Sequence, residues 1–425
     1  MTTLGAALPG TATGADPFRR SWKLPIVYGV ITVIGLLLFV VLGRSGSSTF
    51  GLAGGDAVAL PPLVLPARGT GIVTVLIGAV CTAVSVLLTR SGRRQTVWLP
   101  IVFTLSLVTG LLVWATSGET LPVPGLLAGS LALSVPLIFG ALGGVISERV
   151  GVVNVAIEGQ LLAGAFTSAV IGSLTKNLVA GLVGAMVAGM LVSFVLAAFA
   201  IKYLVDQVIV GVVLNVLVLG LTSFLYSALH VPSSTTLNSP PQFEPIAIPV
   251  LSAIPILGPV LFDQTLIVYL MYVAVAAVTI GLFATRWGLR LRAVGEHPQA
   301  ADTVGINVGA TRFWNVSLAG AIAGLGGAYF TLAAVPSFSK DVTSGAGFIA
   351  LAAVIFGQWN PVRATLAALL FGFASNLQNV LGILNSPVPS DFLLMLPYLV
   401  TIFAVAGFVG QVRGPAAAGK PYIKG

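Results

Sequence analysis

The stretch SERVGVVNVAIEGQ, residues 147–160, places six polar side chains within fourteen residues, between two long apolar runs. Each run has about 20 residues, the length that a helix needs to cross a hydrocarbon layer of about 30 Å. Polar and ionisable groups are costly at that depth, so they are expected to face a protein interior or a path for water and solute. The stretch raises the hypothesis that the chain moves something through a membrane.

The composition is that of a membrane protein. Of the 425 residues, 57% are hydrophobic and 8% are charged, against about 45–50% and about 25% in soluble domains. Apolar runs of spanning length recur from residue 25 almost to the C-terminus. Because only helices and closed barrels span a bilayer, and barrel-type alternation does not appear, the sequence predicts an all-α polytopic bundle with about 10–12 spans.

Twelve candidate spans can be drawn, of which the tenth is short. They cover residues 25–43, 71–89, 97–116, 125–147, 155–174, 178–200, 208–229, 265–284, 313–335, 345–360, 364–384 and 391–412. Glycines interrupt 150–160 and 345–360, so these two segments are expected to be broken or re-entrant. With the N-terminus inside, sixteen of the twenty Lys and Arg residues face the cytoplasm, as the positive-inside rule requires. Both termini are then cytoplasmic.

Four regions follow from these spans. They are an N-terminal cytoplasmic tail (1–24), accessory helices (25–120), a transmembrane core (121–412) and a C-terminal cytoplasmic tail (413–425). Segments 125–229 and 313–412 of the core hold four spans each and start on opposite sides of the membrane, which indicates an inverted repeat. The basic interior loop 285–312 precedes the second segment, and a short helix is expected in it between Pro298 and Gly305.

Enzymatic and nucleotide-binding constellations are lacking. GPAAAGKP (414–421) imitates a phosphate-binding loop, but Pro421 stands where Ser or Thr must hold Mg²⁺. A disordered Ala/Gly tail is expected there instead. His230 and His297 fall on opposite sides of the membrane, no H-E-x-x-H motif is present, and the single Cys81 has no partner in the chain. Neither catalysis nor a metal site is expected.

Several amide and carboxyl side chains lie within or beside the apolar runs. The candidates for a translocation path or gate are Asn154, Glu158, Gln160, Asn215, Asn376 and Asn379. Asn154 and Glu158 share one face if their segment is helical. Three interpretations stay open: these groups contact the solute, they join a broken helix to its neighbours and satisfy freed backbone groups, or they are exposed to the cytoplasm near a helix end.

Four sequence blocks resemble one family. ISERVGVVNVAIEGQLLAGAF (146–166), DQVIVGVVLNVLVLGLTSFL (206–225), TRWGLRLRAVGEHPQAADTVGINV (285–308) and GAGFIALAAVIFGQWNPVRATLAALLFG (345–372) are similar to motifs of permease subunits of bacterial ABC importers. The class is that of branched-chain amino acid, simple sugar and nucleoside importers, and the first two blocks look most like its nucleoside branch. The likeness covers about residues 120–412 and leaves 1–120 unmatched.

The resemblance implies a permease of the larger importer type, in the bacterial cytoplasmic membrane, that carries a small polar solute. A separate cytoplasmic ATPase would bind the ATP and Mg²⁺, so no cofactor is expected in this chain. Further implied partners are a second, related permease and an extracytoplasmic solute-binding lipoprotein. Loop 285–312 would be the coupling loop on which the ATPase docks, through Arg290, Arg292, Ala293, Gly295, Glu296, Ala300, Ala301 and Gly305.

Two other functions stay open. An ion-coupled secondary transporter would also show inverted repeats and polar residues near the membrane centre. An intramembrane enzyme is less favoured, because no nucleophile–base pair or metal set can be assembled. The solute itself, whether nucleoside, sugar or amino acid, is not fixed by the residues.

Overall fold

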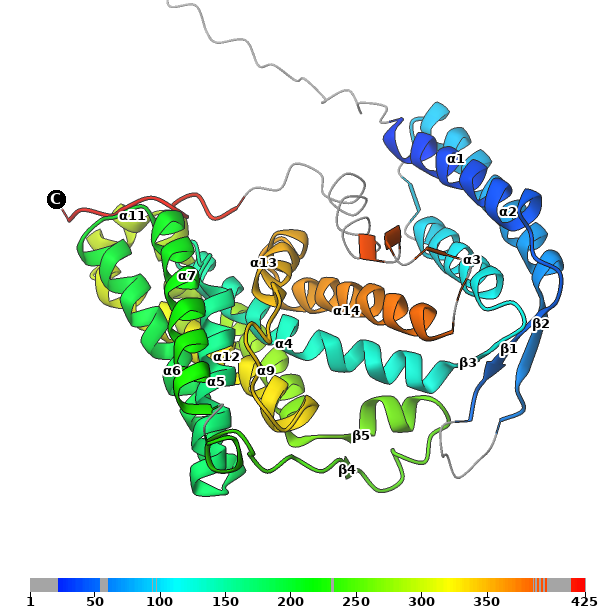
Figure 1. The fold of residues 1–425 in the computed structure, drawn as a ribbon. Helices are drawn as coiled ribbons and strands as arrows, with labels where there is room; N and C mark the ends of the chain where they lie inside the picture. The colour runs from blue at the N-terminus through cyan, green and yellow to red at the C-terminus, as the bar shows by residue number, and fades with distance from the viewer. Residues whose placement is uncertain are drawn as a thin grey trace, which may run out of the picture. The chain divides into compact units, whose positions relative to one another are not determined.

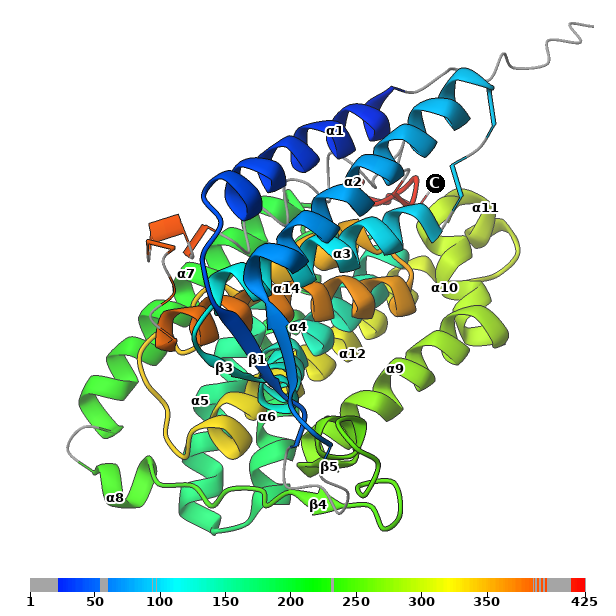
Figure 2. The same ribbon diagram turned by 90° about the vertical axis from the view of Figure 1, so that its right-hand side faces the viewer.

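A computed structural model of the chain describes residues 22–53, 60–93, 95–96, 98–230, 233–384, 386, 388–389, 391–392, 394–395 and 414–424. Figures 1 and 2 show the helical fold from two sides. The chain divides into two compact units. Unit 1 comprises residues 1–48 and 64–119, and unit 2 comprises residues 49–63 and 120–425.

Unit 1 is a bundle of three apolar helices. These are α1 (Lys23–Gly35), continued by the π-helical turn η1 (Leu36–Val41), α2 (Ala67–Arg90) and α3 (Trp98–Ala115). The ring of Tyr28 stacks on that of Phe103 with centroids 4.3 Å apart, and both rings are buried together with Cys81. The stacked rings and the buried thiol therefore pack in the centre of this bundle.

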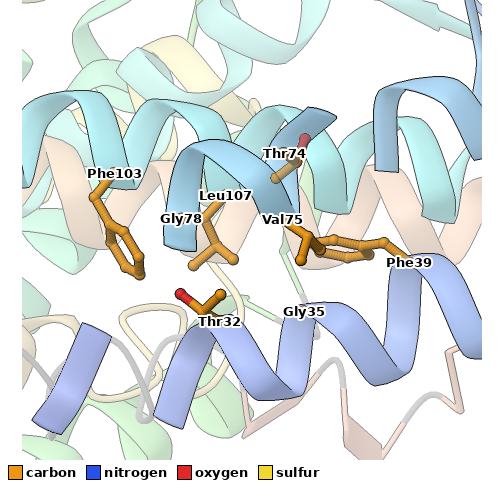
Figure 3. A pocket seen from close by; sticks show the side chains of 8 residues that line it. All are labelled: Thr32, Gly35, Phe39, Thr74, Val75, Gly78, Phe103 and Leu107. Atoms are coloured by element: carbon orange, nitrogen blue, oxygen red, sulfur yellow. The ribbon is translucent and has the colours of Figure 1, made fainter. Parts of the chain in front are cut away.

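A small cavity lies between the helices of unit 1 (Figure 3). Its volume is about 10 Å³, and its lining includes the hydroxyl-bearing residues Thr32 and Thr74 among apolar groups. Such a space holds at most a single water molecule. It is too small to bind a solute, so unit 1 offers no candidate site here.

Unit 2 contains the remaining helices. Its first half holds α4 (Val123–Arg149), α5 (Ile157–Thr175), α6 (Leu178–Ala197) with η2 (Ala198–Lys202), α7 (Gln207–Leu225) with η3 (Tyr226–His230), and α8 (Ser234–Leu237). Its second half holds η4 (Gly258–Phe262), α9 (Leu266–Ala284), α10 (Arg286–Glu296), α11 (Pro298–Thr303), α12 (Val308–Tyr329) with η5 (Phe330–Ala334), α13 (Ala346–Phe356) and α14 (Pro361–Ile383).

The strands are short. They are β1 (Ser47–Gly51), β2 (Leu63–Pro66), β3 (Thr120–Pro122), β4 (Ile246–Ala247) and β5 (Asp263–Gln264). Within unit 2, β1 pairs in parallel with β3, Thr49 opposite Thr120, and β4 pairs antiparallel with β5, Ile246 opposite Gln264.

Polar side chains mark where several helices begin. Each accepts hydrogen bonds from free backbone N–H groups of the first turn. The capping residues are Asn177 of α6, Asp206 of α7, Thr285 of α10, Asn307 of α12 and Asn360 of α14. These caps fix the helix starts from local sequence.

The core of unit 2 lies where α4, α5, α6 and α12 meet. Apolar helices gain no hydrophobic drive from one another in lipid, so close backbone contact has to hold them together. Gly320 and Gly324 of α12 supply it, because a Cβ at either position would collide with the backbone of α6. On α4, Gly140 and Gly144 instead make room for side chains, those of Ile157 of α5 and of Ala350 and Val354 of α13.

Ten helices within the described residues are long and apolar enough to cross a membrane. This confirms the predicted all-α polytopic fold, with two qualifications to the twelve drawn spans. The segment 345–360 forms α13, which at 11 residues reaches only about 16 Å and cannot cross as a helix. Most of 391–412 lies outside the described residues, and the inverted repeat stays a prediction.

Candidate functional site

The polar stretch 147–160 is broken between α4 and α5. Residues 150–156 are not helical, and α5 begins only at Ile157. The shared face of Asn154 and Glu158 was expected only if this segment were helical, and that condition is not met. The expected break itself is confirmed, and Gly151 occupies it with a φ of +95°, which glycine adopts without strain.

Asn154 and Gln160 pair with each other across this break. The Asn154 amide donates to the Gln160 carbonyl oxygen, and the Gln160 amide donates back to Asn154 Oδ1, each at 3.1 Å. The same Gln160 amide donates to Ser193 Oγ of α6 at 2.8 Å. All three residues are buried, so the pair ties the non-helical segment to α5 and α6.

Glu158 joins the start of α5 to the start of α13. Its Oε1 accepts from the Thr343 hydroxyl at 2.6 Å and from the Gly345 N–H at 2.9 Å, while its Oε2 accepts from the Gly347 N–H at 2.6 Å. A carboxylate is favourable at a helix N-terminus, where backbone N–H groups lack intrahelical acceptors. Glu158 thus caps the N-terminus of the short helix α13 within the core.

The other predicted polar residues divide into two groups. Asn215 of α7 accepts from the Gly159 N–H and donates to the Val155 carbonyl oxygen, both at 2.8 Å. Asn376 of α14 donates to the Leu126 carbonyl oxygen of α4 at 2.7 Å. Asn379 is exposed, away from this network. The structure thus brings Asn154, Glu158, Gln160 and Asn215 together and places Asn376 and Asn379 elsewhere.

A buried link that the site prediction omitted lies at the end of α4. The Trp359 indole N–H donates to Glu148 Oε2 at 2.5 Å. Arg149 Nε donates to the Trp359 carbonyl oxygen at 2.9 Å. An acid beside a membrane run was the available signal, but its tryptophan partner lies 211 residues away.

Replacing Trp359 with phenylalanine removes the indole donor from the buried Glu148 carboxyl group. We expect a loss of about 1–3 kcal/mol of stability, because a buried acceptor loses its hydrogen-bond donor. Thermal unfolding in detergent, followed by circular dichroism, measures it. The matched control is Trp98→Phe, because Trp98 of α3 is exposed. Equal midpoints for the two variants would show that the Glu148 link carries no stability.

The basic loop 285–312 is more ordered than the expected single short helix. The helix predicted between Pro298 and Gly305 is confirmed as α11, and α10 precedes it. Gly295 packs so closely on the backbone of the α4 end that a Cβ would collide with the Arg149 carbonyl oxygen. The loop is therefore fixed directly to the polar break between α4 and α5.

The predicted coupling residues differ in exposure. Arg292 lies 5.3 Å from the centroid of the Phe283 ring, in cation–π geometry. Arg290, Glu296, Ala300 and Gly305 are exposed, Ala293 is half-buried, and Gly295 and Ala301 are buried. The exposed members can meet a partner, whereas Gly295 and Ala301 hold the loop in place.

The C-terminal segment 414–424 is packed on this loop, so the expected disordered tail is wrong. The Ala417 N–H donates to the Gly295 carbonyl oxygen at 2.9 Å, and the Ala416 N–H donates to Glu296 Oε2 at 3.2 Å. Pro415 and Ala417 are buried. Small side chains let the backbone lie close to α10, an interaction that a local reading of Ala and Gly could not reveal.

Comparison with known proteins identifies the chain's family. Residues 126–405 match the family described as the permease component of branched-chain amino acid transport systems. The chain belongs to this permease family. The match includes both halves of the helical core and the basic loop. The described role of the family is transport, not catalysis.

Among curated proteins, the permease is similar to the guanosine ABC transporter permease protein NupQ of Bacillus subtilis. The two are 41% identical over 313 residues, which cover 70% of this chain and 95% of NupQ. The nucleoside ABC transporter permease protein NupC of Lactococcus lactis is 41% identical over 309 residues, which cover 70% and 96%. A putative glucose ABC transporter permease protein of Haloferax volcanii, TsgC13, is 37% identical over 254 residues, which cover 60% and 77%. No solved structure matches the chain at a significant level.

The permease is thus a multi-pass membrane protein of the ABC transporter type. Its family membership confirms the resemblance seen in the four sequence blocks. The part of the chain before residue 126 lies outside the family match, as the sequence blocks predicted.

Proposed function

We propose that this permease is the transmembrane subunit of an ATP-driven importer whose solute is a nucleoside. The observation that carries the solute class is the 41% identity, over nearly the full length of the relatives, to two permeases named for guanosine and nucleosides. The putative glucose permease is less similar, so a simple sugar is the second candidate solute.

A second, related permease completes the proposed membrane unit. Bacillus subtilis and Lactococcus lactis each have another permease, NupP and NupB, to which this chain is only 27% and 25% identical. Both are named for the same solutes as NupQ and NupC. This supports a pairing of two different permeases, together with a solute-binding lipoprotein outside the membrane.

A cytoplasmic ATPase supplies the energy in this proposal and holds the ATP and Mg²⁺. It docks on α10 and α11, where Arg290, Glu296 and Ala300 are exposed. The exposed cations Arg286 and Arg290 also favour the cytoplasmic side for this face. The C-terminal segment, which contacts α10, is then cytoplasmic too, and we place the N-terminus on the same side.

Residues 150–160 act as the support of a gate in this proposal. Their amide and carboxylate groups are engaged with α6, α7 and α13, which favours the joining of broken helices over direct solute contact. Movement of α10 reaches them through the contact between Gly295 and Arg149. The break between α4 and α5 therefore links the docking face to the buried end of α13.

Uptake into proteoliposomes tests the proposed function. Vesicles that contain this permease, its partner permease, the ATPase and the binding lipoprotein are expected to take up labelled guanosine only when ATP is supplied. An inactive ATPase variant and labelled glucose are the controls. Guanosine uptake by this chain alone, driven by an ion gradient, would instead establish the ion-coupled alternative.

A further inference from the structure

The C-terminal segment 414–424 forms part of the surface of the basic loop. Figures 1 and 2 both show it beside α11, where the red end of the ribbon lies against the loop. Its backbone is bonded to Gly295 and Glu296. Tyr422 and Asp302 of α11 line the same hollow. The segment is therefore attached to α10 and lies beside α11, the two helices on which an ATPase would dock.

The hydroxyl group of Tyr422 stays protonated. Desolvation, with the hydrogen bond to Asp302 and that residue's negative charge, raises the pKa of Tyr422 above its ordinary value. A phenol whose pKa starts near 10 stays protonated at cellular pH, so Tyr422 adds no negative charge beside Asp302.

Arg312 of α12 binds the C-terminal segment 414–424 through a buried side chain. Its side chain is only 2% exposed, and its Nη1 donates to the Lys420 carbonyl oxygen at 3.0 Å. Within the described part of the chain, its Nε and Nη2 have no hydrogen-bond partner. Burying a guanidinium with unfilled donors is costly. The bond to Lys420 is therefore the compensation that the segment provides, and it fixes where the segment lies.

Apolar side chains are exposed on this face, which lies outside the apolar spans. Ile423 is 72% exposed and Val304, just after α11, is 75% exposed. Hollows of about 460 and 630 Å³ flank the segment, and Tyr422 lines both. Lys420 and Lys424 are exposed beside them. Exposed aliphatic groups beside hollows, with a charged rim, are typical of a protein interface.

We propose that residues 414–424, together with α10 and α11, form a single composite docking surface for the ATPase. The proposal rests on the function proposed above. The ATPase surface that fits has apolar side chains that enter the hollows beside Ile423 and Val304, and carboxylates that meet Lys420 and Lys424. Arg312 is a positioning residue, because it acts on the partner only through the segment that it holds.

The test uses the assembled complex of this permease, its partner permease and the cognate ATPase, captured through a tag on the partner permease. Ile423→Asp and deletion of 414–425 are each expected to lower the co-purified ATPase at least tenfold and leave the pairing of the permeases unchanged. Val250→Asp is the matched control, because Val250 is 84% exposed in the loop after β4 and far in sequence from the docking face. It should change recovery less than twofold.

A second measurement does not depend on the stability of the complex. In a Cys81→Ser background, Ile423→Cys is expected to crosslink to the ATPase through a short bifunctional maleimide, whereas Val250→Cys is not. A nitroxide attached to the thiol introduced by Ile423→Cys reports on the role of Arg312. The mobility of the nitroxide should rise when Arg312→Gln is added. With Arg312→Lys in its place, the mobility should return part of the way to its original value.

Each of the following outcomes would contradict the proposal. Unchanged ATPase recovery with both Ile423→Asp and the deletion would show that the segment is no part of the interface. Increased recovery with the deletion would make the segment a competitor of the ATPase. If ATPase recovery is unchanged but the variants lose binding to anionic lipid vesicles, the surface formed by residues 414–424 binds lipid instead of the ATPase. If the unaltered chain captures no ATPase, the proposed function fails first.

Discussion

Glu158→Ala is expected to abolish uptake and to destabilise the permease strongly. The substitution leaves the Thr343 hydroxyl and the N–H groups of Gly345 and Gly347 without their acceptor. A buried donor without a partner costs about 1–3 kcal/mol, so the total is on the order of 3–6 kcal/mol after partial relaxation. Water cannot replace the carboxylate easily, because Glu158 is buried.

The measurement combines uptake by reconstituted vesicles with thermal unfolding in detergent. Glu158→Gln is expected to give an intermediate loss, because the amide keeps one acceptor oxygen but turns an N–H group toward other donors. Glu244→Ala is the control, since Glu244 is exposed in the loop before β4. A Glu158→Ala protein with the stability and uptake of the control would show that Glu158 does not close α13.

Gly295→Ala is expected to uncouple the transporter. The added methyl group collides with the Arg149 carbonyl oxygen, and overpacking of this kind costs about 1–3 kcal/mol when the backbone has to shift. We expect α10 to move away from the break between α4 and α5. ATP hydrolysis by the complex should then persist while uptake falls more than tenfold, because movement no longer reaches the buried polar segment.

Parallel assays of ATP hydrolysis and uptake in the same vesicles separate coupling from assembly. Gly309→Ala is the matched control, because Gly309 lies in the first turn of α12 and a Cβ there meets only Asn307 Oδ1, at 3.8 Å. If Gly295→Ala reduces hydrolysis and uptake in equal proportion, the contact serves assembly of the complex and not transmission within it.

Much of the fold could be predicted from the residues in order. Hydropathy, glycine breaks and helix caps are local properties, so the spans, the break near 150–156 and the helix α11 were predicted close to their actual places. The short α13 was expected to be irregular, but where it begins depends on Glu158, which accepts hydrogen bonds from its first turn and comes from another part of the chain.

The candidate site was less predictable. Polar residues inside apolar runs could be selected one by one, and four of them lie in or against residues 154–160, where Asn154 and Gln160 bond to each other and Asn215 bonds to the backbone. Which groups they pair with could not be known, because Glu158 bonds to residues 185–189 positions away and Glu148 to one 211 positions away. For the same reason Asn379 could not be distinguished from Asn376, although only Asn376 reaches α4.

The amino-acid sequence by itself determined that this protein is a helical membrane protein, because the cost of placing each side chain in hydrocarbon adds up along the chain. Its four motif blocks added the resemblance to permeases. Only the tertiary structure decided that the carboxylate of Glu158 caps α13 and that the C-terminal segment lies on α10. Buried hydrogen bonds and backbone contacts need two groups at fixed distance, and only folding brings such distant residues together.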